Sequence, residues 1–263
     1  CHIYERMLLY MYQYCGVSIH FAESLETISE NLNEINPHVM SAVPRLLEKV
    51  YDKIYAKGAN LKGIKKVLFF WAVDLGLKYQ PYGQNGGWYE FQLKIARKLI
   101  FSKWRAALGG ELEVVASGSA ALQTRLAKVF NAAGIPIMEG YGLTETSPVV
   151  SVNDMRNKHF RIGSVGKIIK DTEVKIASDG EILVKGPQVM MGYYKDGDKT
   201  AEVLKDNWFH TGDIGIMDEQ GYTRIVDRKK DMIIVSGFNV FPSELENVIS
   251  TCPGVVECAA VGI

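Results

Sequence analysis

Apolar residues in the first third of the chain recur with the period of a helix. In residues 44–57 they return every three or four positions, so they share one helix face. Pro44 suits the first helical position and Gly58 the stop. Residues 27–30 have the form of a capping box, which predicts another helix start. Residues 88–108 form a second long helical region, rich in Trp, Phe, Ile and basic residues.

The middle of the chain alternates between strand and helix patterns. Residues 112–116 are predicted as an apolar strand, residues 117–119 as a tight loop, and residues 120–133 as a helix that Gly134 ends. Residues 135–138 are the next predicted strand. This order is a compact βαβ unit, which predicts a parallel sheet with a right-handed crossover.

After Gly163 the apolar residues alternate with period two, which is typical of half-buried strands. Two hairpins are predicted, each with a turn between its strands: residues 174–176 and 182–185 around 178–180, and residues 214–217 and 222–226 around 218–221. The pattern restarts after a charged run, with a strand at 232–235, a turn at 236–237, a helix at 242–249 and a strand at 255–263.

These patterns predict an α/β fold, in which a parallel βαβ region is followed by a small antiparallel β-region and then by a truncated α+β domain. We expect residues 1–227 to be the C-terminal part of one large domain, α/β to about residue 162 and hairpins at 163–227. Residues 228–263 are then the start of a small C-terminal domain, because fewer than about 40 residues rarely fold alone. The chain begins at Cys1 and stops on an apolar run, so we expect a piece of a longer protein.

Composition narrows the class of protein. The 30 Lys and Arg residues balance 30 Asp and Glu residues, which argues against a nucleic-acid binder that relies on a global basic field. An apolar content of 47% supports a sizeable core rather than disorder. The uncharged stretch at 7–22 is shorter than the ~20 apolar residues of a membrane span. Four cysteines without zinc-site spacing predict free thiols in a reduced cytosol, with a Cys252–Cys258 disulfide as the alternative. We therefore expect a cytoplasmic protein.

One segment directly follows a predicted parallel strand, which is where ligands bind in open α/β sheets. It reads Gly140-Tyr141-Gly142-Leu143-Thr144-Glu145-Thr146-Ser147-Pro148. Its glycines let the backbone approach a ligand and leave the ring face of Tyr141 open. Thr144 offers a hydroxyl to a phosphate, and Glu145 is a hard oxygen ligand suited to Mg²⁺. A polar loop with a buried tyrosine is the alternative interpretation.

Two further segments carry candidate chemistry. Asp213 ends the run Trp208-Phe209-His210-Thr211-Gly212-Asp213, and its two acceptor oxygens can take both hydroxyls of a ribose. A turn aspartate is the alternative. The charge cluster Asp227-Arg228-Lys229-Lys230-Asp231 lies between two strand patterns, and a solvated linker is its alternative. Residues 163–167 are too short and too β-like for a phosphate loop, and the sequence has neither a serine nucleophile elbow nor an HExxH zinc motif.

In this order, the three motifs resemble those of the adenylate-forming superfamily, which includes acyl-CoA synthetases, peptide-synthetase adenylation domains and beetle luciferases. Residues 180–182 and 192–194 also resemble its "GE…GY" stretch, so the resemblance covers essentially the whole chain. It implies a nucleotide site with the following residues: Gly118, Ser119 and Ala120 in the adenine-binding loop; Gly140, Tyr141 and Gly142 around the stacked adenine; Asp213 and Arg228 at the ribose; Lys230 as the hinge of the small domain; and Gly237 in the loop that enters the site for the thioester step.

The same resemblance implies three catalytic residues, Thr144, Glu145 and Arg228, with Glu145 as the Mg²⁺ ligand. Residues 2–6, residues 43–45 and an aromatic-rich insertion at 67–108 are similar to the long-chain fatty acyl-CoA synthetase branch. The resemblance to that branch implies a two-step reaction. A fatty carboxylate attacks the α-phosphorus of ATP to give acyl-AMP and pyrophosphate, and the thiol of coenzyme A then displaces AMP.

The implied small molecules are a fatty acid, ATP/AMP, Mg²⁺ and coenzyme A, and no nucleic-acid partner is expected. An acyl-AMP ligase that loads a carrier protein is one alternative. A non-catalytic nucleotide- or lipid-binding relative is another. The sequence leaves the acyl chain length, the acceptor and the oligomeric state open.

Two expectations concern this chain in particular. The phosphate loop that should precede residue 1 and the catalytic lysine that should follow residue 263 are absent, so we expect the chain alone to be inactive. The region 88–108 carries five basic residues and one acid, and one interpretation places it on a membrane surface. A helix packed on the main domain with a solvated basic face is the other interpretation.

Overall fold

The computed structural model describes residues 2–236, 238–250, 252, 255 and 258–262, and the chain divides into two compact units. Unit 1 comprises Cys1–Gly140 and Asn153–Gly163, and unit 2 comprises Tyr141–Val152 and Ser164–Ile263. The chain therefore passes from one unit to the other within the predicted nucleotide motif. The expected start of a separate small domain at residue 228 stays a prediction.

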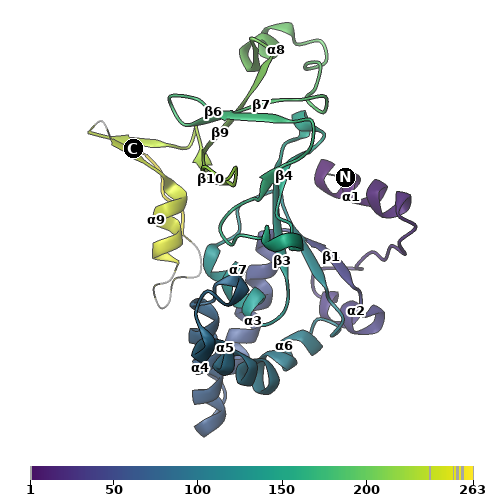
Figure 1. Ribbon diagram of the computed structural model, residues 1–263, viewed down its shortest axis with the longest axis vertical. Coiled ribbons are helices and arrows are strands. Elements are labelled where there is room, and N and C mark those ends of the chain that lie inside the picture. Colours follow the sequence, from purple (N-terminus) through teal and green to yellow (C-terminus); the bar gives the residue numbers. More distant parts are fainter. Residues whose placement is uncertain (1, 237, 251, 253–254, 256–257, 263) are drawn as a thin grey trace. The chain divides into compact units, whose positions relative to one another are not determined.

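Unit 1 is mostly helical around three parallel strands (Figure 1). Its helices are α1 (Ile3–Tyr14), α2 (Ile28–Ile35), α3 (Pro44–Ala59), α4 (Gly63–Leu77), α5 (Gly87–Ala96), α6 (Ser102–Ala106) and α7 (Thr124–Ala132), with a π-helical turn η2 (Arg97–Phe101) and 3₁₀ turns η1 (Pro81–Gly83) and η4 (Arg156–Lys158). Its strands are β1 (Val39–Ala42), β2 (Val114–Ser117) and β3 (Ile137–Gly142), of which β3 continues into unit 2. β2 pairs in parallel with both β1 and β3, so the predicted parallel βαβ unit is confirmed.

Two local predictions about the helices of unit 1 need correction. Gly58 does not end α3, because the helix continues to Ala59; a Cβ at Gly58 would lie 2.1 Å from the ring of Phe69, so this glycine permits close packing of α3 on α4. The helix after residue 27 begins as predicted, but its capping box does not form, since the hydroxyl of Thr27 bonds that of Ser24 at 3.1 Å.

The βαβ unit also has different bounds from those predicted. The helix starts at Thr124 rather than at residue 120, and Gln123 before it has the non-helical angles φ −57° and ψ 124°. β3 extends to Gly142 rather than ending at residue 138. The first half of the nucleotide motif is therefore the end of a strand and not a loop.

The core of unit 1 is aromatic. The indole of Trp104 packs edge-on against three rings, with centroid distances of 5.1 Å to Phe101, 6.3 Å to Tyr51 and 6.4 Å to Phe130. Leu93 and Phe101 have no exposed surface, so one face of the helical region 88–108 is part of this core. The predicted helical character of that region is confirmed.

Unit 2 is built on an antiparallel sheet with strand order β10-β9-β7-β6, and β8 pairs with β9 (Figure 1). Its strands are β4 (Val149–Val152), β5 (Lys167–Ile168), β6 (Glu173–Ile176), β7 (Glu181–Lys185), β8 (Leu204–Lys205), β9 (Trp208–Met217), β10 (Thr223–Arg228), β11 (Ile233–Val235) and β12 (Phe238–Val240). Its helices are α8 (Gly197–Val203), α9 (Pro242–Ile249) and the 3₁₀ turn η3 (Thr144–Thr146). Both predicted hairpins and the helix at 242–249 are confirmed, as is the mixed α/β class.

The end of the chain differs from the prediction. No strand forms in residues 255 and 258–262, which are the described part of the predicted strand 255–263. Gly237 lies outside the described residues. Cys15, Cys252 and Cys258 are free, so the alternative disulfide is not formed. Among the described residues, no helix is long and apolar enough to cross a membrane.

Candidate functional site

The nucleotide motif forms a tight turn after β3. The hydroxyl of Thr146 is fully buried, accepts the amide of Leu143 at 2.9 Å and donates to the carbonyl of Pro148. A Cβ at Gly142 would lie 1.7 Å from the same carbonyl oxygen. Only glycine at this position therefore allows the turn to close. That Gly142 also lets a ligand approach stays a prediction. Thr144 is left exposed at the apex.

Unit 2 brings Tyr141 and Asp213 together, although they are 72 residues apart in the sequence. The phenol of Tyr141 donates to Oδ2 of Asp213 at 2.7 Å. Asp213 lies on β9 opposite Arg228 of β10, and Nε of Arg228 is 3.7 Å from Oδ1 of Asp213. The carboxylate is nearly buried while the guanidinium is 62% exposed. These three groups converge as predicted; their role in nucleotide binding stays a prediction.

Burial governs the protonation of this pair. It raises the pKa of Asp213, and the hydrogen bond from Tyr141 and the charge of Arg228 only partly offset that effect. Burial, followed by the charge of Asp213, raises the pKa of Tyr141 well above its usual range. Tyr141 is therefore a neutral phenol that donates its proton to the carboxylate.

Glu145 is the middle residue of η3 in the same turn. Its Oε1 accepts the phenol of Tyr193 at 2.9 Å, and its carbonyl accepts the amide of Met190 at 2.8 Å. Burial, and then the hydrogen bond to Glu145, raises the pKa of Tyr193 to about 12. Tyr193 belongs to the "GE…GY" stretch, in which the resemblance assigns it no role. Its position next to Glu145 follows only from the fold.

The donor set around Glu145 fits Mg²⁺ bound together with a substrate. The described residues contain no group of three or more His, Cys, Asp or Glu side chains placed to hold a metal ion. Mg²⁺ is commonly bound by one or two carboxylates, with water and substrate phosphates completing the octahedron. One carboxylate beside an exposed hydroxyl is compatible with that mode and not with a dedicated all-protein metal cage.

The predicted adenine loop belongs to unit 1. A Cβ at Gly118 would lie 2.7 Å from the ring of Tyr4, whose hydroxyl donates to the carbonyl of Ala116 at 2.9 Å. Tyr4 therefore shapes the loop after β2, a role that the sequence analysis missed. Ser119, Ala120 and Gly140 also lie in unit 1. Their predicted convergence with the residues of unit 2 stays a prediction.

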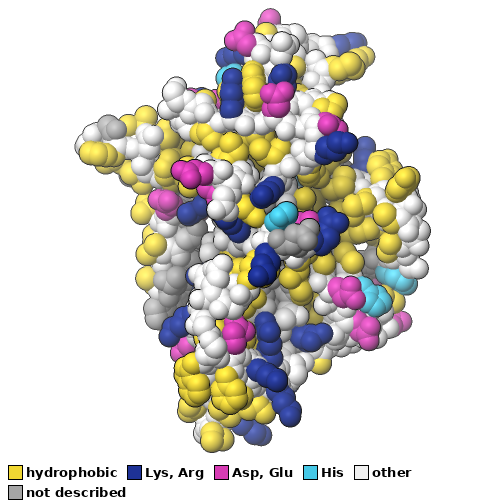
Figure 2. All heavy atoms as spheres, in the orientation of Figure 1, with side chains coloured by type: hydrophobic (Ala, Val, Ile, Leu, Met, Phe, Trp, Pro, Cys, Tyr) yellow, Lys and Arg dark blue, Asp and Glu magenta, His cyan; other side chains and the backbone are white. Residues whose placement is uncertain are grey.

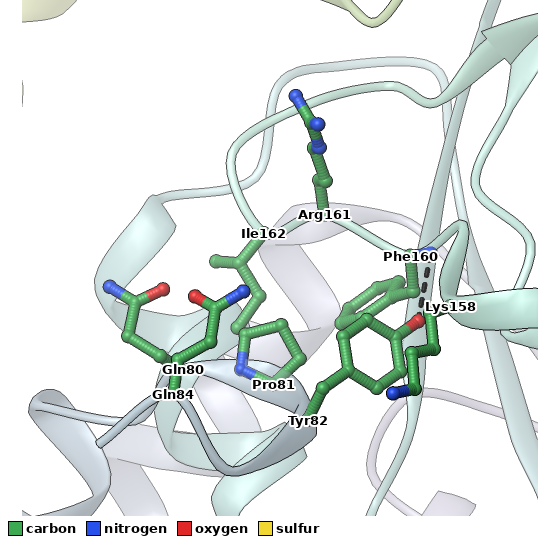
Figure 3. A pocket seen from close by; sticks show the side chains of 8 residues that line it. All are labelled: Gln80, Pro81, Tyr82, Gln84, Lys158, Phe160, Arg161 and Ile162. Atoms are coloured by element: carbon green, nitrogen blue, oxygen red, sulfur yellow. Dashed lines mark hydrogen bonds between the residues drawn. The ribbon is translucent and has the colours of Figure 1, made fainter. Parts of the chain in front are cut away.

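Unit 1 also has a hollow of about 530 Å³, which no sequence pattern predicts. Figure 3 shows its lining: Gln80, Pro81, Tyr82, Gln84, Lys158, Phe160, Arg161 and Ile162. The amide of Phe160 donates to the hydroxyl of Tyr82 at 2.9 Å and joins its two walls. None of the predicted site residues lines it.

Glu139 is a buried carboxyl group on β3, immediately before the motif, and it is 8% exposed. Burial raises its pKa from 4.5 to about 7, although a hydrogen bond from the backbone of Leu122 lowers it. The pKa of the folded state therefore lies above that of the unfolded state. The folded protein binds this proton more tightly, so the contribution of Glu139 to stability is fully present below pH 4.5 and is lost as the pH rises through about 7.

Replacing Glu139 with Gln is therefore expected to stabilise the chain at pH 8 by about 3 kcal/mol, because the buried charge is removed while the amide oxygen still accepts the Leu122 bond. At pH 4 the variant and the wild type should be equally stable. Urea unfolding at both pH values measures the difference. Glu113→Gln, an exposed change near β2, is the matched control. A difference that does not depend on pH would contradict the burial argument.

A phenol, a buried carboxylate and a guanidinium, with a turn that presents a hydroxyl and a carboxylate, define a candidate nucleotide-binding site on an α/β scaffold. The sequence pattern described as AMP-binding enzyme matches residues 1–194. The chain belongs to this family.

Named relatives agree with the family. The chain is 53% identical over 137 residues to a long-chain-fatty-acid–CoA ligase of Escherichia coli, a match that covers 48% of this chain and 24% of the relative. It is 34% identical to a long-chain-fatty-acid–CoA ligase of Mycobacterium bovis over 99% of this chain and 44% of the relative.

The fold matches solved adenylate-forming enzymes. The o-succinylbenzoate CoA synthetase of Bacillus subtilis with its acyl-adenylate intermediate superposes with a TM-score of 0.70 at 22% identity, over 100% of this chain and 46% of that one. The same enzyme with ATP and magnesium ion gives a TM-score of 0.68 at 22% identity, over 100% and 47%. The chain spans less than half the length of these relatives.

Proposed function

We propose that the full-length protein to which these residues belong is an ATP-dependent long-chain fatty acid–CoA ligase. It converts a fatty acid, ATP and coenzyme A into acyl-CoA, AMP and pyrophosphate through an acyl-adenylate. The observation that carries the proposal is the convergence of Tyr141, Asp213 and Arg228 within unit 2, on motifs of the AMP-binding enzyme family. The relatives that are long-chain-fatty-acid–CoA ligases support the substrate class.

The residues of the site suit adenylation without a protein nucleophile. The substrate carboxylate itself attacks the α-phosphorus and pyrophosphate leaves, so the protein only has to orient the reactants and neutralise charge. Asp213 accepts the ribose hydroxyls, and Tyr141 fixes the orientation of that carboxylate while offering its ring face to the adenine. Thr144 donates its hydroxyl to a phosphate oxygen. Glu145 holds Mg²⁺, which supplies charge neutralisation at the phosphates when bound.

A test needs both binding and turnover. Isothermal titration of this chain with AMP tests the nucleotide site. A thioester assay of the full-length protein with ATP, coenzyme A and acids of increasing chain length tests the reaction and its specificity. Pyrophosphate release without consumption of coenzyme A supports the carrier-protein ligase instead. AMP binding without any turnover supports the non-catalytic relative.

We also propose that residues 228–263 begin the small domain and that Lys230 is its hinge. Lys229, just before it in the same unit, forms ion pairs of 2.8 Å with Glu181 of β7 and with Asp179 in the turn before β7. Lys230 is exposed. A hinge at Lys230 can therefore change its backbone angles while both ion pairs of Lys229 stay in place.

We further propose that the exposed side of α5 and η2 meets a membrane surface. Trp88 and Phe91 are 74% and 55% exposed, and their rings stack at a centroid distance of 5.7 Å. Lys94, Lys98 and Lys103 are exposed in the same region. Figure 2 shows hydrophobic and basic side chains together over the part of unit 1 where α4 and α5 lie. Apolar side chains among cations are the composition that binds anionic lipid surfaces.

Replacing Lys94, Lys98 and Lys103 with Gln is expected to weaken co-sedimentation with anionic vesicles at least ~10-fold at low salt, since each lysine near such a surface contributes about 1 kcal/mol. The change should have little effect on neutral vesicles. Arg97 and Arg105 are kept, because they donate to the carbonyls of Ala132 and Gly110.

The matched control replaces three exposed lysines of α3, namely Lys49, Lys53 and Lys57. It removes the same charge from another helix of the same unit. If the variant without Lys94, Lys98 and Lys103 sediments with anionic vesicles as the wild type does, the membrane proposal is wrong. The region is then a packed helix with a solvated basic face.

A further inference from the structure

Strand β9 carries a bulge at the predicted ribose-binding residue. In its pairing with β7, His210 lies opposite Leu183, and Ile214 lies opposite Glu181. Two steps on β7 thus correspond to four on β9, so the three residues 211–213 of β9 face the single residue Ile182 of β7. Bulges re-aim side chains and are enriched next to active sites. The peptide groups in the bulge need partners other than the backbone of β7.

Glu181 provides the main partner. Its Oε1 accepts the amide of Gly212 at 2.9 Å, and its Oε2 accepts Nζ of Lys229 at 2.8 Å. Nδ1 of His210 lies 3.3 Å from the same Oε2. The residue is only 5% exposed. Burial raises the pKa of Glu181, but the hydrogen bonds from Lys229, Gly212 and His210 outweigh it and hold the pKa below its usual value. A buried carboxylate therefore stays ionised beneath the bulge.

The carbonyl of Gly212, in the next peptide group, is held by Lys229. The backbone amide of Lys229 donates to the carbonyl of Gly212 at 2.8 Å, while its side chain bonds Glu181 and Asp179. Gly212 has a φ of 73°, a left-handed conformation that glycine adopts without strain. The amide of Gly212 is therefore held by the carboxylate of Glu181, and its carbonyl is held by the backbone amide of Lys229. This fixes the direction in which Asp213 leaves the bulge.

We infer that Glu181 is a positioning residue for Asp213, and this rests on the proposed function of Asp213 as the acceptor of the ribose hydroxyls. Glu181 does not touch the nucleotide. It holds the Gly212 peptide so that the Asp213 carboxylate faces the phenol of Tyr141 and the guanidinium of Arg228. A binding group must be held to within about 0.5 Å to be effective, and a bulge cannot achieve that without such support.

The test compares AMP with 2′,3′-dideoxy-AMP, which lacks the hydroxyls that Asp213 accepts. Wild-type chain should bind AMP more tightly than the dideoxy nucleotide. Glu181→Gln should reduce this preference about tenfold, because the amide cannot hold both Gly212 and Lys229, while affinity for the dideoxy nucleotide stays nearly unchanged. The matched control is Glu173→Gln, which removes an exposed carboxylate paired with Lys185 at 3.0 Å in the same sheet. It should keep the full preference.

The outcomes distinguish the proposed role of Asp213 at the ribose from the inferred role of Glu181 in positioning it. If the wild type binds neither nucleotide, or binds both equally, the proposed role of Asp213 fails and the inference fails with it. If the wild type prefers AMP and Glu181→Gln keeps that preference, only the inference is overturned. Should Glu181→Gln fail to fold by circular dichroism, Lys229→Gln decides, since the Lys229 side chain is 42% exposed and its loss is milder. A partial loss of preference supports the inference, and an unchanged preference overturns it.

Discussion

Replacing Asp213 with Ala is expected to weaken the binding of AMP to this chain by roughly 100- to 10,000-fold, because two charge-assisted hydrogen bonds to the ribose are lost, each of about 1.5–3 kcal/mol. The side chain is nearly buried and already oriented by the phenol of Tyr141 at 2.7 Å. Its binding geometry is therefore prepared before the nucleotide arrives. Isothermal titration with AMP measures the effect.

Variants of Asp213 that lose affinity for AMP should not lose folding stability in parallel. Burial raises the pKa of Asp213, so the folded state is stabilised by protonation and this contribution is lost as the pH rises through the raised pKa. Asp213→Asn removes the buried charge and is expected to be at least as stable as the wild type at pH 7, while it binds AMP poorly. Asp198→Ala, an exposed change on α8, is the control that should leave both properties unaltered. AMP binding within about threefold of the wild type in Asp213→Ala is incompatible with the site as described.

Replacing Gly142 with Ala is expected to destabilise the chain by about 3 kcal/mol and to abolish AMP binding, because the new methyl group meets backbone that cannot move aside. A Cβ there would lie 1.7 Å from the carbonyl oxygen of Pro148 and 3.0 Å from Cα of Val149. The turn must open, which displaces Thr144 and Glu145 together. Thermal unfolding should show a midpoint lower by roughly 10 °C.

The control for this change is Gly197→Ala at the start of α8. It lies in the same unit and its Cβ would meet nothing within 4 Å. It should leave the unfolding midpoint and AMP binding unchanged. If Gly142→Ala instead keeps a wild-type midpoint, the closed turn is not the structure that the chain adopts.

Much of the local structure could be predicted because it depends on neighbours in the sequence. The hairpin between β6 and β7 follows from alternating residues around an Asp-Gly turn, and α9 follows from Pro242 at its first position. The ends of helices and strands were predicted wrongly where a contact with a residue distant in the sequence determines them. α3 passes through Gly58 because the ring of Phe69 fills the space next to it. β3 continues into the Gly140–Gly142 stretch because pairing, rather than local preference, determines where a strand ends.

By itself, the sequence determined the order of elements, the α/β class and the identity of the polar residues at the motif positions, since periodicity and turn chemistry act over a few residues. Only the tertiary structure decided which of those residues meet. It joined Tyr141 to Asp213 across 72 positions, placed Tyr193 on Glu145, and put Glu181 beneath the Gly212 peptide. Such contacts depend on the order of the strands and on the bulge that shifts the register of β9 against β7. Neither feature can be predicted from residues that are neighbours in the sequence. The site's chemistry is therefore visible in the residue types, whereas its geometry arises from the packing of the sheet.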